Sequence, residues 1–121
     1  MRHAAKTYGA VANQTANPRE LEADLLLTAA ARLQAIRDAW EGKRLELDAA
    51  LLYNRKLWSI FVTAATSKEN PLPAGMRQNV ANLGLFVFKQ TLTTLVDPKP
   101  ENLGSLININ RELAAGLLGR A

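Results

Sequence analysis

Side chains suited to acid–base, nucleophilic or metal chemistry are sparse in this chain of 121 residues. Cysteine is absent and His3 is the single histidine, so no thiolate nucleophile and no zinc site with Cys and His ligands is expected. Ser59, Ser67 and Ser105 have no candidate base near them, and no phosphate-binding loop or nucleophile elbow is present. The sequence therefore predicts a protein that is not an enzyme and that uses no metal or cofactor.

One group of carboxylates has a simpler explanation than catalysis. Glu20, Glu22 and Asp24 follow Asn17 and Pro18, which have the types expected for a helix N-cap and first helical position. Glu20 is placed to close a capping box, and negative charge in the first turns is stabilised by the helix dipole. We interpret this cluster as the start of a helix.

Amide side chains form the next notable pattern. Gln78, Asn79 and Asn82 precede the apolar run 83–88, inside a helix expected over residues 73–96. Asn is a poor helix former, so its presence there requires a reason. Two remain open, an amide network between neighbouring helices and a polar strip that contacts a partner's backbone. Since the apolar run faces nearly every side, we expect this helix at the centre of the domain.

Large aromatic side chains are candidates both for a core and for binding anchors. For each one alone, burial in the core is favoured. The helices expected over 43–66 and 73–96 nevertheless carry more large apolar residues than two bundle helices usually hide. They predict an apolar groove that receives an amphipathic helix from a partner. The aromatic residues concerned are Trp40, Trp58, Phe61, Phe86 and Phe88.

Apolar residues recur at steps of three and four, which indicates one-sided helices, and no segment has the period of a strand. The fold class is therefore all-α, a single domain over residues 1–121 with four main helices and a weaker N-terminal helix. Asn54 and Asn110 fall inside apolar stripes of the third and fifth helices. Gly42 is expected to form a tight corner between the second and third helices. The expected helices cover residues 3–16, 18–40, 43–66, 73–96 and about 99–117.

The formal net charge of +4 is unevenly distributed. Residues 49–89 carry most of the excess of basic side chains, which favours an acidic partner but forms no dense stripe for nucleic acid. The longest apolar run is far shorter than the roughly 20 residues of a membrane span. The first residues, 1–6, do not resemble a signal peptide. We expect a cytoplasmic protein without a membrane partner.

Several segments together resemble the FlaF family of flagellar biosynthesis regulators. The resemblance covers essentially the whole chain, in order, and is therefore more specific than any single motif. It implies a cytoplasmic factor of α-proteobacteria that binds flagellin and works with or against the translational regulator FlbT. The family implies no catalytic residues. The segments are 17–23, 29–36, 52–58, 70–73, 77–88 and 107–117.

The resemblance suggests a mechanism in which the protein is a secretion chaperone that holds a terminal flagellin segment in an apolar groove before export. In this hypothesis four aromatic residues anchor the segment, four amides set its register and two cations favour its acidic stretches. These partner-binding candidates are, in that order, Trp58, Phe61, Phe86, Phe88, Asn54, Asn79, Asn82, Asn110, Arg55 and Lys56.

Two other functions remain open at this stage. The protein can regulate flagellin synthesis by acting on flagellin mRNA, alone or through an FlbT-like protein, as its basic residues suggest. It can also be a structural adaptor that contacts regulators or the flagellar export apparatus without binding flagellin. The basic residues concerned are Arg55, Lys56, Lys68, Arg77 and Lys89.

Overall fold

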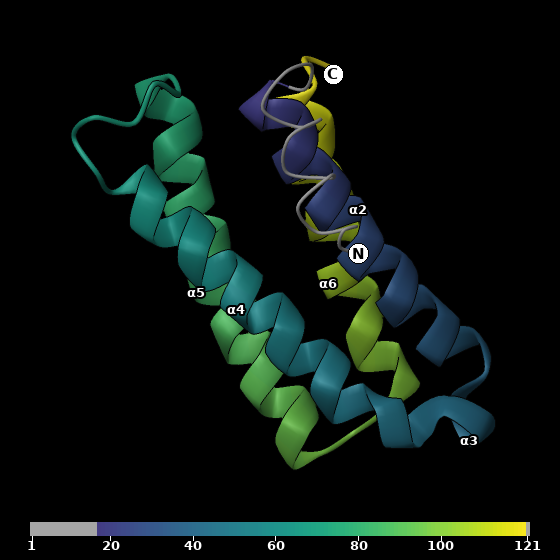
Figure 1. Ribbon diagram of the computed structural model, residues 1–121. Coiled ribbons are helices and arrows are strands. Elements are labelled where there is room, and N and C mark those ends of the chain that lie inside the picture. Colours follow the sequence, from purple (N-terminus) through teal and green to yellow (C-terminus); the bar gives the residue numbers. More distant parts are fainter. Residues whose placement is uncertain (1–16, 121) are drawn as a thin grey trace, which may run out of the picture.

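The computed structural model describes residues 17–120, which form an up-down-up-down arrangement of helices (Figure 1). No strand occurs in this part of the chain, and the expected all-α fold is confirmed. The helix expected over residues 3–16 lies outside the described residues. The helices are α2 (Pro18–Asp38), α3 (Trp40–Lys43), α4 (Leu47–Ala65), α5 (Ala74–Val96) and α6 (Leu103–Leu117), with 3-10 turns at Arg44–Glu46 and Pro100–Asn102.

Helix α2 begins as the sequence predicts but ends differently. The Asn17 side chain accepts a hydrogen bond of 2.8 Å from the Glu20 backbone N–H, and Pro18 occupies the first helical position. At the other end the chain leaves α2 at Ala39, whose φ of −125° is available to any residue. Gly42 lies inside the short helix α3, so the expected glycine corner is wrong. The corner needs no left-handed backbone and therefore no glycine.

The helices associate as two pairs. Helix α2 packs along α6 and α4 packs along α5, while contacts between α2 and α4 join the pairs. In Figure 1 the pairs meet near α3 and diverge toward the end where α2 begins and α4 connects to α5. This divergence matters because a cleft opens at that end.

The core is built mainly by α2, α4 and α6. The expectation that α4 and α6 are one-sided helices is confirmed, because the apolar stripes that contain Asn54 and Asn110 are buried. Trp58 is fully enclosed at the centre, with Phe61 edge-on to it at 6.3 Å between ring centroids. The buried residues of these stripes are Leu47, Leu51, Asn54, Trp58, Phe61 and Ala65 in α4 and Leu103, Leu106, Ile107, Asn110, Leu113, Ala114 and Leu117 in α6.

Helix α5 lies at the edge of the bundle, so the expectation that it is central is wrong. Its contact with α4 depends on Gly84, where an added Cβ would overlap the Val62 side chain. Val80 and Val87 are buried on the same side, whereas Leu85 on the other side is 66% exposed. The apolar run is therefore not covered on all sides, because α5 has a close neighbour on one side and solvent on the other.

A buried amide cluster fixes the three core helices relative to one another. The Asn110 side chain accepts a hydrogen bond of 2.8 Å from the Trp58 indole N–H. Its amide group donates to the Leu26 carbonyl oxygen at 3.2 Å and to the Asn54 side-chain oxygen at 2.7 Å. These bonds connect α2, α4 and α6, and buried amides with such partners specify one packing arrangement.

Candidate functional site

One surface of α5 presents a long row of exposed side chains. Residues three and four apart lie on one side of a helix, so these side chains form a continuous surface about 27 Å long. Its second half contains two large apolar residues, Leu92 at 62% and Val96 at 77% exposed, together with Lys89 and Thr93. We call this surface the outer face of α5. It consists of Gln78, Asn79, Asn82, Leu85, Phe86, Lys89, Leu92, Thr93 and Val96.

The amides of the outer face occupy its first half. Gln78, Asn79 and Asn82 are all exposed, and the Gln78 side chain donates a hydrogen bond of 3.0 Å to the Asn82 side-chain oxygen. This bond lies within one helix and joins no neighbouring helix. The network between helices that we considered for these three residues is therefore absent from their described contacts. Their side chains are exposed to solvent, where a partner can reach them.

The outer face has one charged residue, Lys89, and is therefore positive. Helix α5 carries Arg77 and Lys89 and no acidic side chain. Arg55 and Lys56 are exposed on α4, and Phe88 on α5 is half-buried against the core. An acidic or neutral partner helix is therefore favoured here over a basic one.

The structure places the other predicted partner-binding residues in the interior. Asn54, Trp58 and Asn110 are fully enclosed and bonded within the amide cluster described above. Phe61 is 8% exposed, at the edge of a small internal pocket. None of these four can form part of an open binding face in this fold. The amides and Trp58 instead hold the scaffold that α5 packs against.

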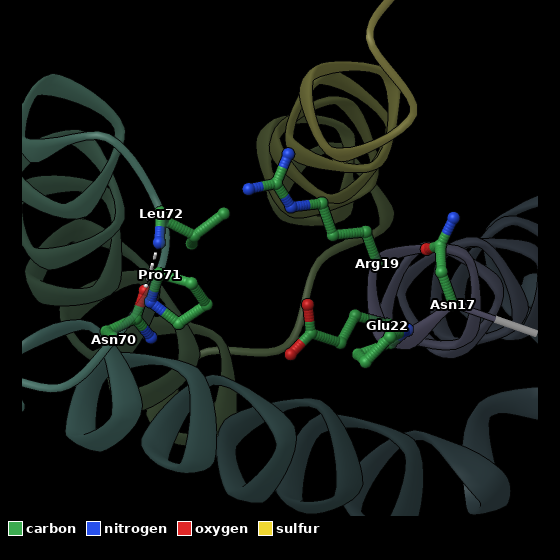
Figure 2. Close-up of a pocket in the computed structure, with 7 residues that line it drawn as sticks. Asn17, Arg19, Glu22, Asn70, Pro71 and Leu72 are labelled. Carbon is green, nitrogen blue, oxygen red and sulfur yellow. Dashed lines mark hydrogen bonds between the residues drawn. The ribbon is translucent and has the colours of Figure 1, made fainter. Parts of the chain in front are cut away.

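A cleft was not predicted from the sequence. It lies between the start of α2 and the loop that joins α4 to α5, with a volume of about 570 Å³ (Figure 2). In Figure 2, Arg19 and Glu22 project from α2 toward the opposite wall, from which Leu72 points back at them. The lining residues are Asn17, Pro18, Arg19, Glu22, Asn70, Pro71 and Leu72.

Hydrogen bonds hold the loop wall of the cleft in place. The Asn70 side chain donates to the Ala64 carbonyl oxygen at 3.0 Å and accepts from the Leu72 backbone N–H at 2.8 Å. The Arg77 guanidinium adds a bond of 3.2 Å to the Ser67 carbonyl oxygen. The loop is thus tied to the end of α4 and to α5, and the cleft is largely formed before any ligand arrives.

The charged group that enters the cleft is Glu22. Burial raises the pKa of its carboxyl above the ordinary value of 4.5, and the nearby Arg19 opposes part of that rise. A second, smaller pocket of about 20 Å³, which holds little more than a water-sized space, shares Glu22, Asn70 and Leu72 with the cleft. Our sequence interpretation of Glu22 as a helix N-terminal charge did not detect this role, because the opposite wall is about fifty residues away.

Two classes of feature are absent from the described part of the chain. No group of three or more His, Cys, Asp or Glu side chains that could hold a metal ion is found among residues 17–120. Within the same range, no helix has the length and apolar character needed to cross a membrane.

Comparison with known families decides the wider class. The family model described as flagellar protein FlaF matches residues 4–117. The chain belongs to the FlaF family. The match includes α2, α4, α5 and α6 in full, so both the outer face of α5 and the cleft lie inside the FlaF region. No curated protein sequence and no solved structure matches the chain. The protein is thus a flagellar protein, and its outer face of α5 and its cleft are described from this structure alone.

Proposed function

We propose that this FlaF protein binds flagellin as a secretion chaperone or regulator, without catalysis. A terminal flagellin segment would dock as an amphipathic helix along the outer face of α5 before export. The observation that carries this proposal is the exposure of Leu85, Phe86, Leu92 and Val96 on one side of a single helix. Membership of a flagellar family supports the choice of flagellin as the partner.

The size of the face suits a weak, reversible complex. Its four large apolar side chains are 43–77% exposed, and together with matching area on the client they give roughly 8 kcal/mol of gross stabilisation when covered. Ordering a flexible client segment costs about 2–5 kcal/mol of that gain. The remainder of about 3–6 kcal/mol corresponds to dissociation constants from tens of micromolar to several millimolar for the apolar contact, before the loss of translational and rotational freedom is counted. Such a complex releases its client readily, as an export chaperone must.

The predicted partner-binding residues then divide by location. Phe86 and Phe88 remain proposed anchors, and Asn79 and Asn82 remain proposed register-setting groups, because all four lie at or beside the outer face. Arg55 and Lys56, exposed on α4, keep their proposed role toward acidic stretches of the client. The enclosed residues support this surface from below. They are Asn54, Trp58, Phe61 and Asn110.

Calorimetry with peptides from both flagellin termini tests this proposal. The wild-type chain should bind one of them, and the double substitution Leu85→Ser with Leu92→Ser should weaken that binding at least tenfold. Leu45→Ser is the matched control, because Leu45 is fully exposed and lies outside the outer face. Absence of binding by either peptide at millimolar concentration would overturn the proposal. Equal loss in the Leu45 control would also overturn the choice of site.

A second candidate function rests on the excess of basic residues along the α4–α5 hairpin. In this alternative the protein regulates flagellin synthesis by acting on flagellin mRNA, directly or through an FlbT-like protein. Binding to RNA through phosphate contacts falls steeply between about 50 and 200 mM salt, whereas an apolar contact changes little. A binding curve for flagellin mRNA over this range therefore separates the two functions. The residues concerned are Arg55, Lys56, Lys68, Arg77 and Lys89.

A further inference from the structure

The cleft is a second concave feature that the proposed flagellin contact does not use. It shares no lining residue with the outer face of α5, and its walls come from α2 and the loop after α4. Its volume of about 570 Å³ lies within the range of about 300–1,000 Å³ that is typical of ligand sites. Asn70 fixes one wall through bonds to Ala64 and Leu72, so a ligand need not order that wall.

Glu22 gives the cleft its chemical character. Its side chain is half-buried, and no hydrogen bond or ion pair to its carboxylate occurs among residues 17–120. Arg19 offsets part of the effect of burial, but burial remains the larger cause of the raised pKa of Glu22. A partly desolvated charge without a direct contact lowers stability, which is a common property of binding sites. Arg19 is exposed at the mouth and is the other charged residue that lines the cleft.

The apolar walls around Glu22 favour a cationic ligand that also carries apolar groups. Pro18 from α2 and Pro71 and Leu72 from the loop provide apolar surface in the same cleft as Glu22. A long cationic side chain has an apolar stem that packs on such walls while its charged end reaches a carboxylate. An acidic ligand would instead place a second negative charge beside a carboxylate that is already poorly solvated.

We propose that the cleft binds a short peptide segment of a partner protein in which a Lys or Arg side chain pairs with Glu22. A large apolar side chain next to that cation packs on Pro18, Pro71 and Leu72. The charge of Glu22 favours the basic residue of such a segment, and the apolar walls of the cleft favour its apolar residue. The inference is independent of flagellin binding on α5, so either site can fail without the other.

Nuclear magnetic resonance of the full chain provides the test. The probe is the capped tripeptide acetyl-Leu-Lys-Leu-amide, compared with the same peptide carrying norleucine in place of lysine. We expect the lysine peptide to shift the backbone amide signals of Glu22, Asn70 and Leu72 and to saturate at millimolar concentration. The norleucine peptide should bind at least fivefold more weakly.

Substitutions identify the group responsible. Glu22→Gln should remove the preference for lysine over norleucine, whereas Glu20→Gln, an exposed neighbour outside the cleft, should keep it. Leu85→Ser with Leu92→Ser should leave the tripeptide shifts unchanged, which separates this site from the flagellin site. Equal binding of both peptides by the wild-type chain, or an unchanged preference in Glu22→Gln, would overturn the proposal. Shifts at the same amides that depend on protein concentration alone would overturn it in favour of a second copy as the occupant.

Discussion

The same side chain, asparagine, has opposite environments in two regions of this protein. Asn54 and Asn110 are fully buried and bonded to each other, while Asn79 and Asn82 on α5 remain in solvent. The first pair lies inside the apolar stripes of two core helices. The second pair precedes a segment that is apolar on several sides. An amide inside a one-sided stripe is therefore forced into the core. There most of its polar atoms find partners, although the Asn54 side-chain nitrogen has none among the described residues.

The comparison separates a scaffold from a surface. In the scaffold, Asn110 connects α2, α4 and α6 and satisfies the indole N–H of Trp58. On the surface, α5 contributes a close contact at Gly84 and leaves its far side open. The buried amides specify how the core helices pack, whereas the exposed amides of α5 form no hydrogen bond with another helix among the described residues. The predictions below test this division.

The largest effect is expected at the amide cluster. Asn110→Ala removes hydrogen-bond partners from the Trp58 indole and the Asn54 side chain and leaves a cavity, so it should destabilise the fold by about 3–5 kcal/mol. Urea unfolding measures this loss. The exposed control Asn79→Ala should stay within about 0.5 kcal/mol of the wild type. Similar losses in the two variants would contradict the division between scaffold and surface.

An intermediate effect is expected where α5 meets α4. Gly84→Ala places a Cβ in the space occupied by the Val62 side chain. The overlap outweighs the gain in helix propensity, so stability should fall by about 1–2 kcal/mol. Val62→Ala removes the side chain that the new Cβ would meet. Measured by urea unfolding, Gly84→Ala should therefore cost much less stability in the Val62→Ala background than in the wild type.

Gly75 provides the matched control for this contact. It lies in the first turn of α5, and an added Cβ would meet nothing within 4 Å. Gly75→Ala should therefore stabilise the protein by about 0.5–1 kcal/mol. If both glycine variants changed stability in the same direction, α5 would not depend on close packing at Gly84.

The smallest effect is expected at Glu22 and depends on pH. The raised pKa means that the folded state favours the protonated carboxyl, so the charged form lowers stability above that pKa. Glu22→Gln should therefore be more stable than Glu20→Gln at neutral pH, by no more than about 0.5 kcal/mol because solvent screens the group. The difference should disappear below the ordinary pKa of 4.5. Thermal unfolding at pH 7 and pH 3.5 checks the sign, and a less stable Glu22→Gln at pH 7 would contradict it.

The sequence predicted the one-sided helices well and the edge helix poorly. The stripes that contain Leu51 and Leu106 face the core because each helix has a single apolar side. The run that contains Leu85 is apolar in several directions, so its local pattern cannot show which side has a neighbour. That depends on α2 pairing with α6, which leaves α5 in contact mainly with α4.

Part of the outer face could be predicted, and the cleft could not. Phe86, Asn79 and Asn82 were chosen as partner-binding candidates because large apolar and amide side chains adjoin on one helix, and all three are exposed in the structure. Their binding of a partner stays a prediction. The cleft requires Glu22 and Leu72 to face each other, and residues so far apart carry no local signal of that contact. The capping pattern around Glu22 also offered a sufficient local explanation for its charge.

Protection of a single thiol tests the central claim most directly, that the outer face of α5 is where flagellin docks. The natural chain has no cysteine, so Leu92→Cys introduces one reactive group on that face. Its rate of alkylation should fall at least tenfold when saturating flagellin is added, while the rate for the fully exposed control Leu45→Cys should not change. Equal rates for Leu92→Cys with and without bound flagellin would contradict the account.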